Sequence, residues 1–162
     1  MPTDSPRKRQ RKKKQRPVIG WREWVALPEL GVDAVKVKID TGARSSALHA
    51  FEVETFAQDG IEVVRFVLHP QQKSSDVTVG PVEAPLHTRK LVRNPGGRVE
   101  MRPVIRTNIV WNSIAFDVDL NLTRRDEMGF RMLLGRQAVR RFLVDPGRSF
   151  LGTVPETQEE TT

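Results

Sequence analysis

The sequence runs Ala34-Val35-Lys36-Val37-Lys38-Ile39-Asp40-Thr41-Gly42-Ala43 through the segment that decides the fold. Apolar and charged residues alternate up to Ile39, a pattern typical of a strand with one buried face. The strand leads into Asp40 in a turn of small residues, which holds a carboxylate rigidly and leaves room for a substrate backbone. We therefore interpret Asp40 as a candidate catalytic carboxylate.

The tripeptide Asp40-Thr41-Gly42 also fits a strand followed by an ordinary Asx-type turn. Peptide hydrolysis by carboxylates requires two of them sharing one proton, because like charges about 3 Å apart cannot both ionise. One then acts as a base on water while the other donates a hydrogen bond to the scissile carbonyl. The chain has a single Asp-Thr-Gly, so the catalytic interpretation predicts a homodimer in which a two-fold axis supplies the second copy.

Other short segments are rich in β-branched residues and bounded by turn formers, which predicts further strands. These segments are residues 61–68, 77–82, 104–110 and 114–122. Asn94-Pro95-Gly96-Gly97 separates residues 89–92 from residues 99–101, and its glycines accept the positive φ of a hairpin turn. The sequence predicts a β-hairpin here, which would form a flap.

One C-terminal segment departs from this pattern. Met132-Leu133-Leu134-Gly135 predicts a buried strand ended by a glycine turn, and residues 136–142 predict a short helix. The chain then returns to an extended form before Pro146, because the residue that precedes a proline is pushed out of the helical region. The whole sequence predicts an all-β fold, a closed or nearly closed barrel with one short C-terminal helix.

The net charge of the chain comes from its N-terminus. Lys and Arg total 27 against 20 Asp and Glu, but eight of the basic residues lie between Arg7 and Arg16. Setting residues 1–16 aside, with Asp4, leaves 19 basic and 19 acidic residues. We expect a disordered basic tail over residues 1–17, one domain over residues 18–152, and a disordered acidic tail over residues 153–162.

The basic tail fits two roles. Its eight cations between residues 7 and 16 can bind RNA or the ribosome non-specifically through counterion release, or they can form a solvated tail without a partner. No aromatic residue is interleaved in residues 7–16, so base stacking has no platform there.

Composition excludes several classes of protein. The chain has no cysteine, which excludes disulfides, thiol nucleophiles and thiolate zinc sites. No apolar run reaches the roughly 18 residues that span a bilayer, and no apolar segment follows the N-terminal charges. We expect a cytoplasmic protein with no membrane partner.

The segments around residues 38–50 and 132–136 together resemble the retropepsin-like aspartic peptidases. The sequence is more closely similar to a bacterial subfamily named ATP-dependent zinc proteases, over about residues 18–151. The matching segments are Gly20-Trp21-Arg22-Glu23-Trp24-Val25-Ala26-Leu27-Pro28, Lys38-Ile39-Asp40-Thr41-Gly42-Ala43-Arg44-Ser45-Ser46-Ala47-Leu48-His49-Ala50 and Met132-Leu133-Leu134-Gly135-Arg136. This resemblance implies a retropepsin-like closed β-barrel with a hairpin flap.

The resemblance also implies roles for residues of the loop. Asp40 would be catalytic, with Thr41, Gly42 and Ala43 in the active-site loop. The segment Leu133-Leu134-Gly135 would cross beneath that loop and support it. We place His49 near the site as a packed or hydrogen-bonded residue that could contact substrate.

The name of the subfamily does not fit the chemistry of the sequence. Zinc hydrolases typically use His-Glu-x-x-His, whereas His49, His69 and His87 are far apart in the sequence. A phosphate loop of the form Gly-x-x-x-x-Gly-Lys-Ser/Thr is also absent. We expect neither a metal nor another cofactor.

Two arginines suggest what the substrate is. In viral retropepsins the position of Arg44 is commonly an acid that pairs with the arginine matching Arg136, and here both positions are basic. Each arginine could pair instead with Asp126, Glu127 or Asp145, or both could line the cleft and bind substrate carboxylates. The subfamily is associated with ATP-grasp ligases that add glutamates, which implies such a ligase as a partner and an acidic or glutamate-modified tail as substrate.

Three hypotheses follow from the sequence. The first is a dimeric aspartic endopeptidase that acts through Asp40. The second is a module of the same fold that binds a peptide or a ligase without cutting. The third is a nucleic-acid accessory protein that binds through its basic tail.

Overall fold

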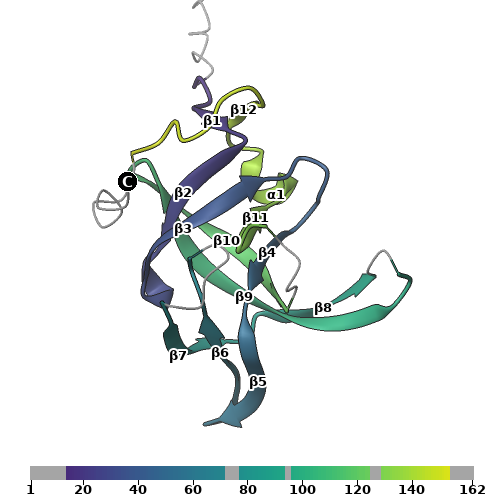
Figure 1. The fold of residues 1–162 in the computed structure, drawn as a ribbon. Helices are drawn as coiled ribbons and strands as arrows, with labels where there is room; N and C mark the ends of the chain where they lie inside the picture. The colour runs from purple at the N-terminus through teal and green to yellow at the C-terminus, as the bar shows by residue number, and fades with distance from the viewer. Residues whose placement is uncertain (1–13, 72–76, 94–95, 125–128, 154–162) are drawn as a thin grey trace, which may run out of the picture.

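The fold is seen in a computed structural model that describes residues 14–71, 77–93, 96–124 and 129–153 (Figure 1). Its elements in chain order are β1 (Val18–Gly20), β2 (Arg22–Leu27), the 3-10 turn η1 (Pro28–Leu30), β3 (Val32–Ile39), β4 (Ser46–His49), β5 (Phe51–Gln58), β6 (Ile61–Leu68), β7 (Val79–Pro85), β8 (Thr88–Arg93), β9 (Val99–Trp111), β10 (Ile114–Thr123), β11 (Met132–Leu134), α1 (Arg136–Val139) and β12 (Leu143–Asp145). The tails predicted for residues 1–17 and 153–162 lie largely outside the described residues.

Six of these strands close into a barrel. They follow one another in the order β10-β4-β11-β3-β2-β9, and β9 pairs with β10 to complete the ring. Strand β3 is antiparallel to β2 and parallel to β11, and β10 is parallel to β4. The predicted closed all-β barrel is confirmed.

Alternation along β3 fixes which side chains enter the barrel. Val35, Val37 and Ile39 are buried and belong to the core, whereas Lys38 is exposed on the outer face. Complete burial of such a side chain contributes about 1.5 to 3 kcal/mol relative to its exposure. The inward row of β3 therefore fixes the register that brings Asp40 to the end of the strand.

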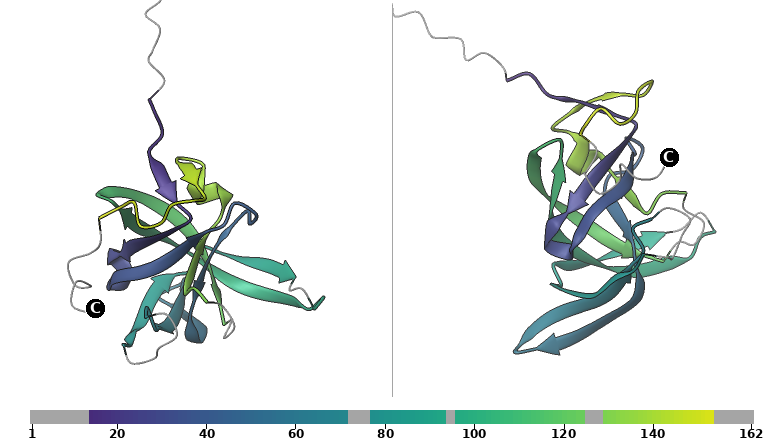
Figure 2. Two further views of the ribbon diagram at one scale, coloured as in Figure 1. Left: turned by 45° about the horizontal axis from the view of Figure 1, so that its top comes forward. Right: turned by 60° about the vertical axis from the view of Figure 1, so that its left-hand side comes forward.

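Three appendages extend from the barrel. Strand β8 pairs with the first half of β9, and this hairpin extends away from the barrel (Figures 1 and 2). The predicted hairpin is confirmed, with Gly97 at φ +82° in its turn, although Asn94 and Pro95 lie outside the described residues. Strands β5, β6 and β7 form a separate three-stranded sheet, and β1 pairs with β12.

The C-terminal prediction is confirmed in type and corrected in length. Strand β11, helix α1 and strand β12 follow one another as expected, but α1 covers Arg136–Val139 rather than residues 136–142. The Phe142 N–H donates to the Val139 carbonyl at 2.8 Å, which closes the chain into a turn. The Phe142 ring packs edge-on against Trp111 and Phe116, so burial of this ring ends the helix early.

Candidate active-site loop

Asp40 lies just beyond the end of β3 and is held by the neighbouring strand. Its backbone N–H donates to the Leu134 carbonyl of β11 at 2.8 Å. Its carboxylate oxygen Oδ1 accepts a hydrogen bond from the Gly42 N–H at 2.9 Å. Asp40 is half-buried, whereas Thr41 and Gly42 are exposed. The carboxylate is thus oriented by the protein and accessible from outside. This geometry fits both an Asx-type turn and a catalytic loop.

Gly135 is the point where the chain crosses the loop. A side chain at this position would overlap the Ser45 carbonyl and lie 2.9 Å from the Ala43 carbonyl oxygen. The Gly135 N–H donates to Ser46 Oγ at 3.0 Å, and the Arg136 N–H donates to the Ala43 carbonyl at 2.8 Å. The loop and the crossing segment are therefore packed backbone against backbone.

The two leucines before Gly135 face opposite ways. Leu134 pairs with Ile39 and is 1% exposed, so it belongs to the core beneath the loop. Leu133 is half-buried and pairs with Lys38 on one side and Ala47 on the other. Leu133 therefore lies on the outer face of the barrel, close to the level of Asp40.

Arg136 contacts the loop through its side chain. Its Nη1 donates to the Thr41 carbonyl oxygen at 3.0 Å. This partner is a carbonyl rather than one of the three carboxylates considered from the sequence, of which Asp126 and Glu127 lie outside the described residues. The third, Asp145, accepts a hydrogen bond from the Gly147 N–H at 3.0 Å. The Arg44 residue is exposed.

His49 is not brought to the loop. Met132 of β11 lies between Leu48 of β4 and Val37 of β3. One residue further along β4, the His49 N–H donates to the Arg131 carbonyl. His49 therefore lies about four residues back from Asp40 along β3, roughly 13 Å at the rise of a strand. Its side chain is buried, and its ring lies edge-on to Phe51 at 4.6 Å.

Lys38 lies next to the loop, although no motif in the sequence marks it as a site residue. Lys38 is exposed on the outer face of β3, two residues before Asp40. The same alternation that predicted the strand could have identified Lys38. It places an exposed cation at the end of the strand that leads into Asp40.

Lys90 reaches the loop from the hairpin. Its Nζ donates to Ser45 Oγ at 2.7 Å. In the paired strand, Arg102 donates to Asn121 Oδ1 at 3.2 Å, and Asn121 donates to the Ser46 carbonyl at 2.7 Å. The base of the hairpin is therefore connected by polar contacts to the chain that follows Asp40. Nothing near Asp40 in the sequence indicates this connection.

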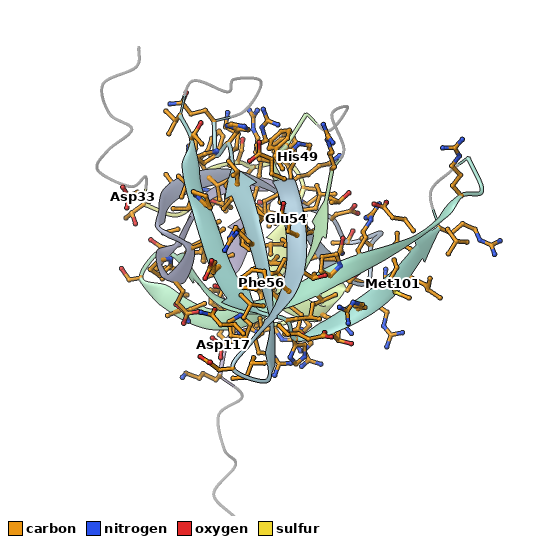
Figure 3. The ribbon with its side chains drawn as sticks, turned by 90° about the horizontal axis from the view of Figure 1, so that it is seen from below. Asp33, His49, Glu54, Phe56, Met101 and Asp117 are labelled. Atoms are coloured by element: carbon orange, nitrogen blue, oxygen red, sulfur yellow. The ribbon has the colours of Figure 1, made fainter. Side chains whose placement is uncertain are left out.

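Neither a metal cluster nor a membrane helix is found in the described part of the chain. No group of three or more His, Cys, Asp or Glu side chains is placed to hold a metal ion among those residues. No helix among them is long and apolar enough to cross a membrane. Figure 3 shows His49 well away from Asp117, which lies on β10 near the other side of the view.

The closed barrel, the Asp-Thr-Gly-Ala loop at the end of β3 and the crossing at Gly135 define a retropepsin-like aspartic peptidase fold. The chain belongs to the RimB-like family, whose model is described as the retropepsin-like aspartic endopeptidase RimB and matches residues 18–155. The resemblance inferred from the sequence is therefore confirmed.

The chain is also similar to longer proteins with another name and to one solved structure. Proteins named probable alpha-L-glutamate ligase from Desulfotalea psychrophila and Parasynechococcus marenigrum are 40% and 42% identical over 89% and 88% of this chain. The chain covers 33% and 31% of those proteins, so it spans about a third of their length. The crystal structure of protein Lpg0085 from Legionella pneumophila, described as of unknown function (DUF785), has a similar fold with a TM-score of 0.68. Its sequence is 29% identical, and the match covers 83% of this chain and 97% of that chain.

Proposed function

We propose that the protein is an aspartic endopeptidase that hydrolyses peptide bonds with Asp40 from each of two subunits. The observation that carries this proposal is the Asp40 carboxylate, oriented by the Gly42 N–H in a loop whose Thr41 and Gly42 are exposed. Membership of a family described by an aspartic endopeptidase supports it. A homodimer places the two exposed loops against each other and completes the carboxylate pair.

The proposed chemistry uses one proton between the two carboxylates. The ionised Asp40 takes a proton from a water molecule, whose oxygen attacks the scissile carbonyl carbon. The protonated Asp40 of the other subunit donates to the carbonyl oxygen, which becomes a hydroxyl of a tetrahedral intermediate. Collapse of the intermediate breaks the C–N bond: the leaving nitrogen takes the proton held by the first Asp40, and the second Asp40 recovers a proton from a hydroxyl of the intermediate as the C=O bond forms again. Two products form, an acid and an amine.

Other residues position the substrate and the loop. Thr41 braces the loop, while Gly42 and Ala43 receive the substrate backbone. Leu134 and Gly135 support the loop from below, where Gly135 leaves no space for a side chain. The β8–β9 hairpin closes over the bound peptide. Because its base already contacts Ser45 through Lys90, movement of the hairpin is coupled to the loop.

The proposed substrate is an acidic protein tail, such as one modified with glutamate. Arg44 and Lys38 are exposed cations next to Asp40 in the sequence, and each can bind a substrate carboxylate. Arg136 contributes positive charge but already holds the Thr41 carbonyl. The relatives named for glutamate ligation are about three times as long as this chain, which supports a ligase as a functional partner.

Peptide profiling by mass spectrometry tests the proposal. Wild-type protein should cleave glutamate-rich peptides, and Asp40→Asn should not, because the amide fits the same space but cannot share the proton. Arg44→Glu should abolish cleavage of glutamate-rich peptides before that of neutral ones. A cleavage pattern that survives Asp40→Asn excludes the mechanism, whereas equal loss on both peptides with Arg44→Glu excludes only the acidic substrate.

A second candidate is a module that binds a peptide or a ligase without cutting. It is favoured by the names of the relatives, which state a ligase activity and no hydrolase activity. It predicts that wild type and Asp40→Asn bind acidic peptides equally and that neither cleaves them. Peptide binding measured beside peptide profiling separates the two functions.

The basic tail could add a ribosome or RNA contact to either function. Residues 1–13 lie outside the described residues, so this role depends on the eight cations of the sequence alone. Deletion of residues 1–16 should weaken co-sedimentation with ribosomes at low salt and leave peptidase activity intact. Unchanged co-sedimentation would leave the tail without this role.

A further inference from the structure

A groove continues from the candidate active-site loop along helix α1. One cavity of about 210 Å³ is lined by Ser45 and by the base of the hairpin, including Lys90. A second cavity of about 340 Å³ extends to Arg140 and Arg141 beyond the end of α1. Both cavities share a lining of Ser46, Asp119 and Gln137. The two cavities therefore adjoin, and we call their combined lining, from Ser45 to Arg141, the α1 groove.

The α1 groove is positively charged. Five cationic side chains line it against two carboxylates. The cations are Arg89, Lys90, Arg106, Arg140 and Arg141, and the carboxylates are Asp117 and Asp119. The groove therefore attracts anions, although the chain outside residues 1–16 is balanced in charge.

Asp119 does not neutralise the free cations, because it is already paired. Its two carboxylate oxygens accept hydrogen bonds from Arg106 Nε at 2.7 Å and Nη2 at 3.2 Å. This bond holds the pKa of Asp119 below its ordinary value. The other groove carboxylate, Asp117, accepts a hydrogen bond from Asn108 Nδ2 at 3.3 Å. Arg89 is likewise paired, with Glu62 at 2.8 Å.

The remaining three cations of the groove, Lys90, Arg140 and Arg141, form no ion pair with a carboxylate of the described residues. Lys90 donates to the neutral Ser45 Oγ, and Arg141 Nε donates to the Ala138 carbonyl oxygen of α1 at 3.0 Å. The Arg141 guanidinium also lies 4.1 Å from the centroid of the Phe116 ring. It is therefore partly removed from water without a hydrogen-bonded carboxylate, and the charge of Asp117 acts on it at longer range, an arrangement that leaves its donors open to an anion.

We propose that the α1 groove binds the outer segment of an extended acidic peptide whose scissile bond lies at Asp40. Lys90 meets carboxylates next to the loop, and Arg140 with Arg141 meets carboxylates further out. This inference rests on the proposed function for the place of the scissile bond. It adds a second binding region, so affinity should increase with the length of the acidic segment.

Binding to an inactive protein tests the groove without cleavage. In the Asp40→Asn chain, fluorescence anisotropy should show that labelled octaglutamate binds more tightly than labelled diglutamate. Adding Arg140→Gln and Arg141→Gln should weaken octaglutamate binding about tenfold, since two partly exposed charge pairs are lost. Diglutamate, which is too short to extend far beyond the loop, should be affected less than about twofold.

The matched control removes two positive charges elsewhere, with Arg65→Gln and Arg148→Gln. Both residues are exposed and line neither cavity of the groove. Equal weakening by the control and the groove variant, or equal weakening for both peptides, would overturn the proposal. Displacement of octaglutamate by an equally charged RNA at a lower concentration would assign the groove to nucleic acid and would also overturn it.

Two further measurements keep the test decisive. Thermal unfolding checks that the double variant is folded; if it is not, Arg140→Gln alone is used, because Arg140 is exposed. In the active chain, the groove variant should raise KM for the long peptide and leave its kcat within about twofold. Length-dependent binding without any cleavage would contradict the proposed function and support the groove. Cleavage that does not depend on peptide length would support the proposed function and contradict the groove.

Discussion

The Arg136 guanidinium donates from Nη1 to the backbone carbonyl oxygen of Thr41 at 3.0 Å. The two residues are 95 positions apart in the sequence, and the contact links the start of α1 to the loop that carries Asp40. Because the Thr41 carbonyl belongs to the same peptide unit as the Gly42 N–H, which donates to Asp40 Oδ1 at 2.9 Å, its position fixes the hydrogen bond that orients the carboxylate. Arg136 is therefore a positioning residue in the proposed mechanism.

Replacing Arg136 should affect turnover more than stability. Arg136→Met removes the hydrogen bond from an exposed side chain, which costs about 1 kcal/mol of unfolding free energy. We expect kcat to fall about tenfold with KM changed less. Steady-state kinetics and urea unfolding measure the two effects. Arg136→Lys should restore part of kcat; a loss of stability that fully accounts for the loss of activity would contradict a positioning role.

Glu23 should be essential for stability. It is completely buried, and its carboxylate accepts hydrogen bonds from Gly20 N–H, Trp111 Nε1, Leu151 N–H and Gly152 N–H at 2.8 to 3.1 Å. Glu23→Gln turns an amide N–H₂ toward these donors, and we expect a loss of about 2 to 4 kcal/mol in the free energy of unfolding. Urea denaturation measures it. Glu54→Gln, on the exposed face of β5, is the control, and similar losses for both variants would contradict the assignment.

Gly135 should tolerate no side chain. Gly135→Ala places a methyl group against the Ser45 and Ala43 carbonyls, so the loop must shift or the crossing segment must separate from it. We expect a loss of about 3 kcal/mol or more and no detectable cleavage. Gly147→Ala is the matched control, because its methyl would meet its nearest neighbour, Asp145 Oδ1, at 3.5 Å. A Gly135→Ala protein as stable and active as this control would contradict the packing described.

The Arg106–Asp119 pair should contribute to acid stability. The hydrogen bond from Arg106 lowers the pKa of Asp119 from its ordinary value. A carboxyl whose folded pKa is depressed stabilises the protein above its unfolded pKa of about 3.9, and this contribution is lost as the pH falls through the folded pKa. Arg106→Gln should therefore raise the pKa of Asp119 toward the unfolded value in an NMR titration and weaken the pH dependence of unfolding between pH 5 and 2, roughly. An unchanged titration would contradict the pairing.

The barrel could be predicted from the sequence because its decisive strands follow simple patterns. Strand β3 alternates, and Gly135 ends a short apolar strand. Strand β2 was not predicted, because its inward row begins with the buried Glu23, a charged residue where a strand pattern expects an apolar one. Strand β5 was not predicted either, since residues Phe51–Gln58 are mostly exposed and have no buried face to produce alternation.

The candidate site was only partly predictable for a different reason. Asp40 and Gly135 are local signals, because each needs a particular residue type at a turn. Lys90 reaches Ser45 only through the pairing of β8 with the barrel strand β9, and no spacing in the sequence encodes its approach. His49 shows the reverse case, since it is near Asp40 in the sequence but is carried away from the loop along β4.

The distance between the two Asp40 carboxyl groups in a crystal structure of the assembled protein tests the central claim most directly. A shared proton requires a separation of about 3 Å between their nearest oxygens, across a two-fold axis. We predict that separation. A strictly monomeric protein, or an assembly that holds the two carboxyl groups far apart, would contradict the proposed peptidase mechanism.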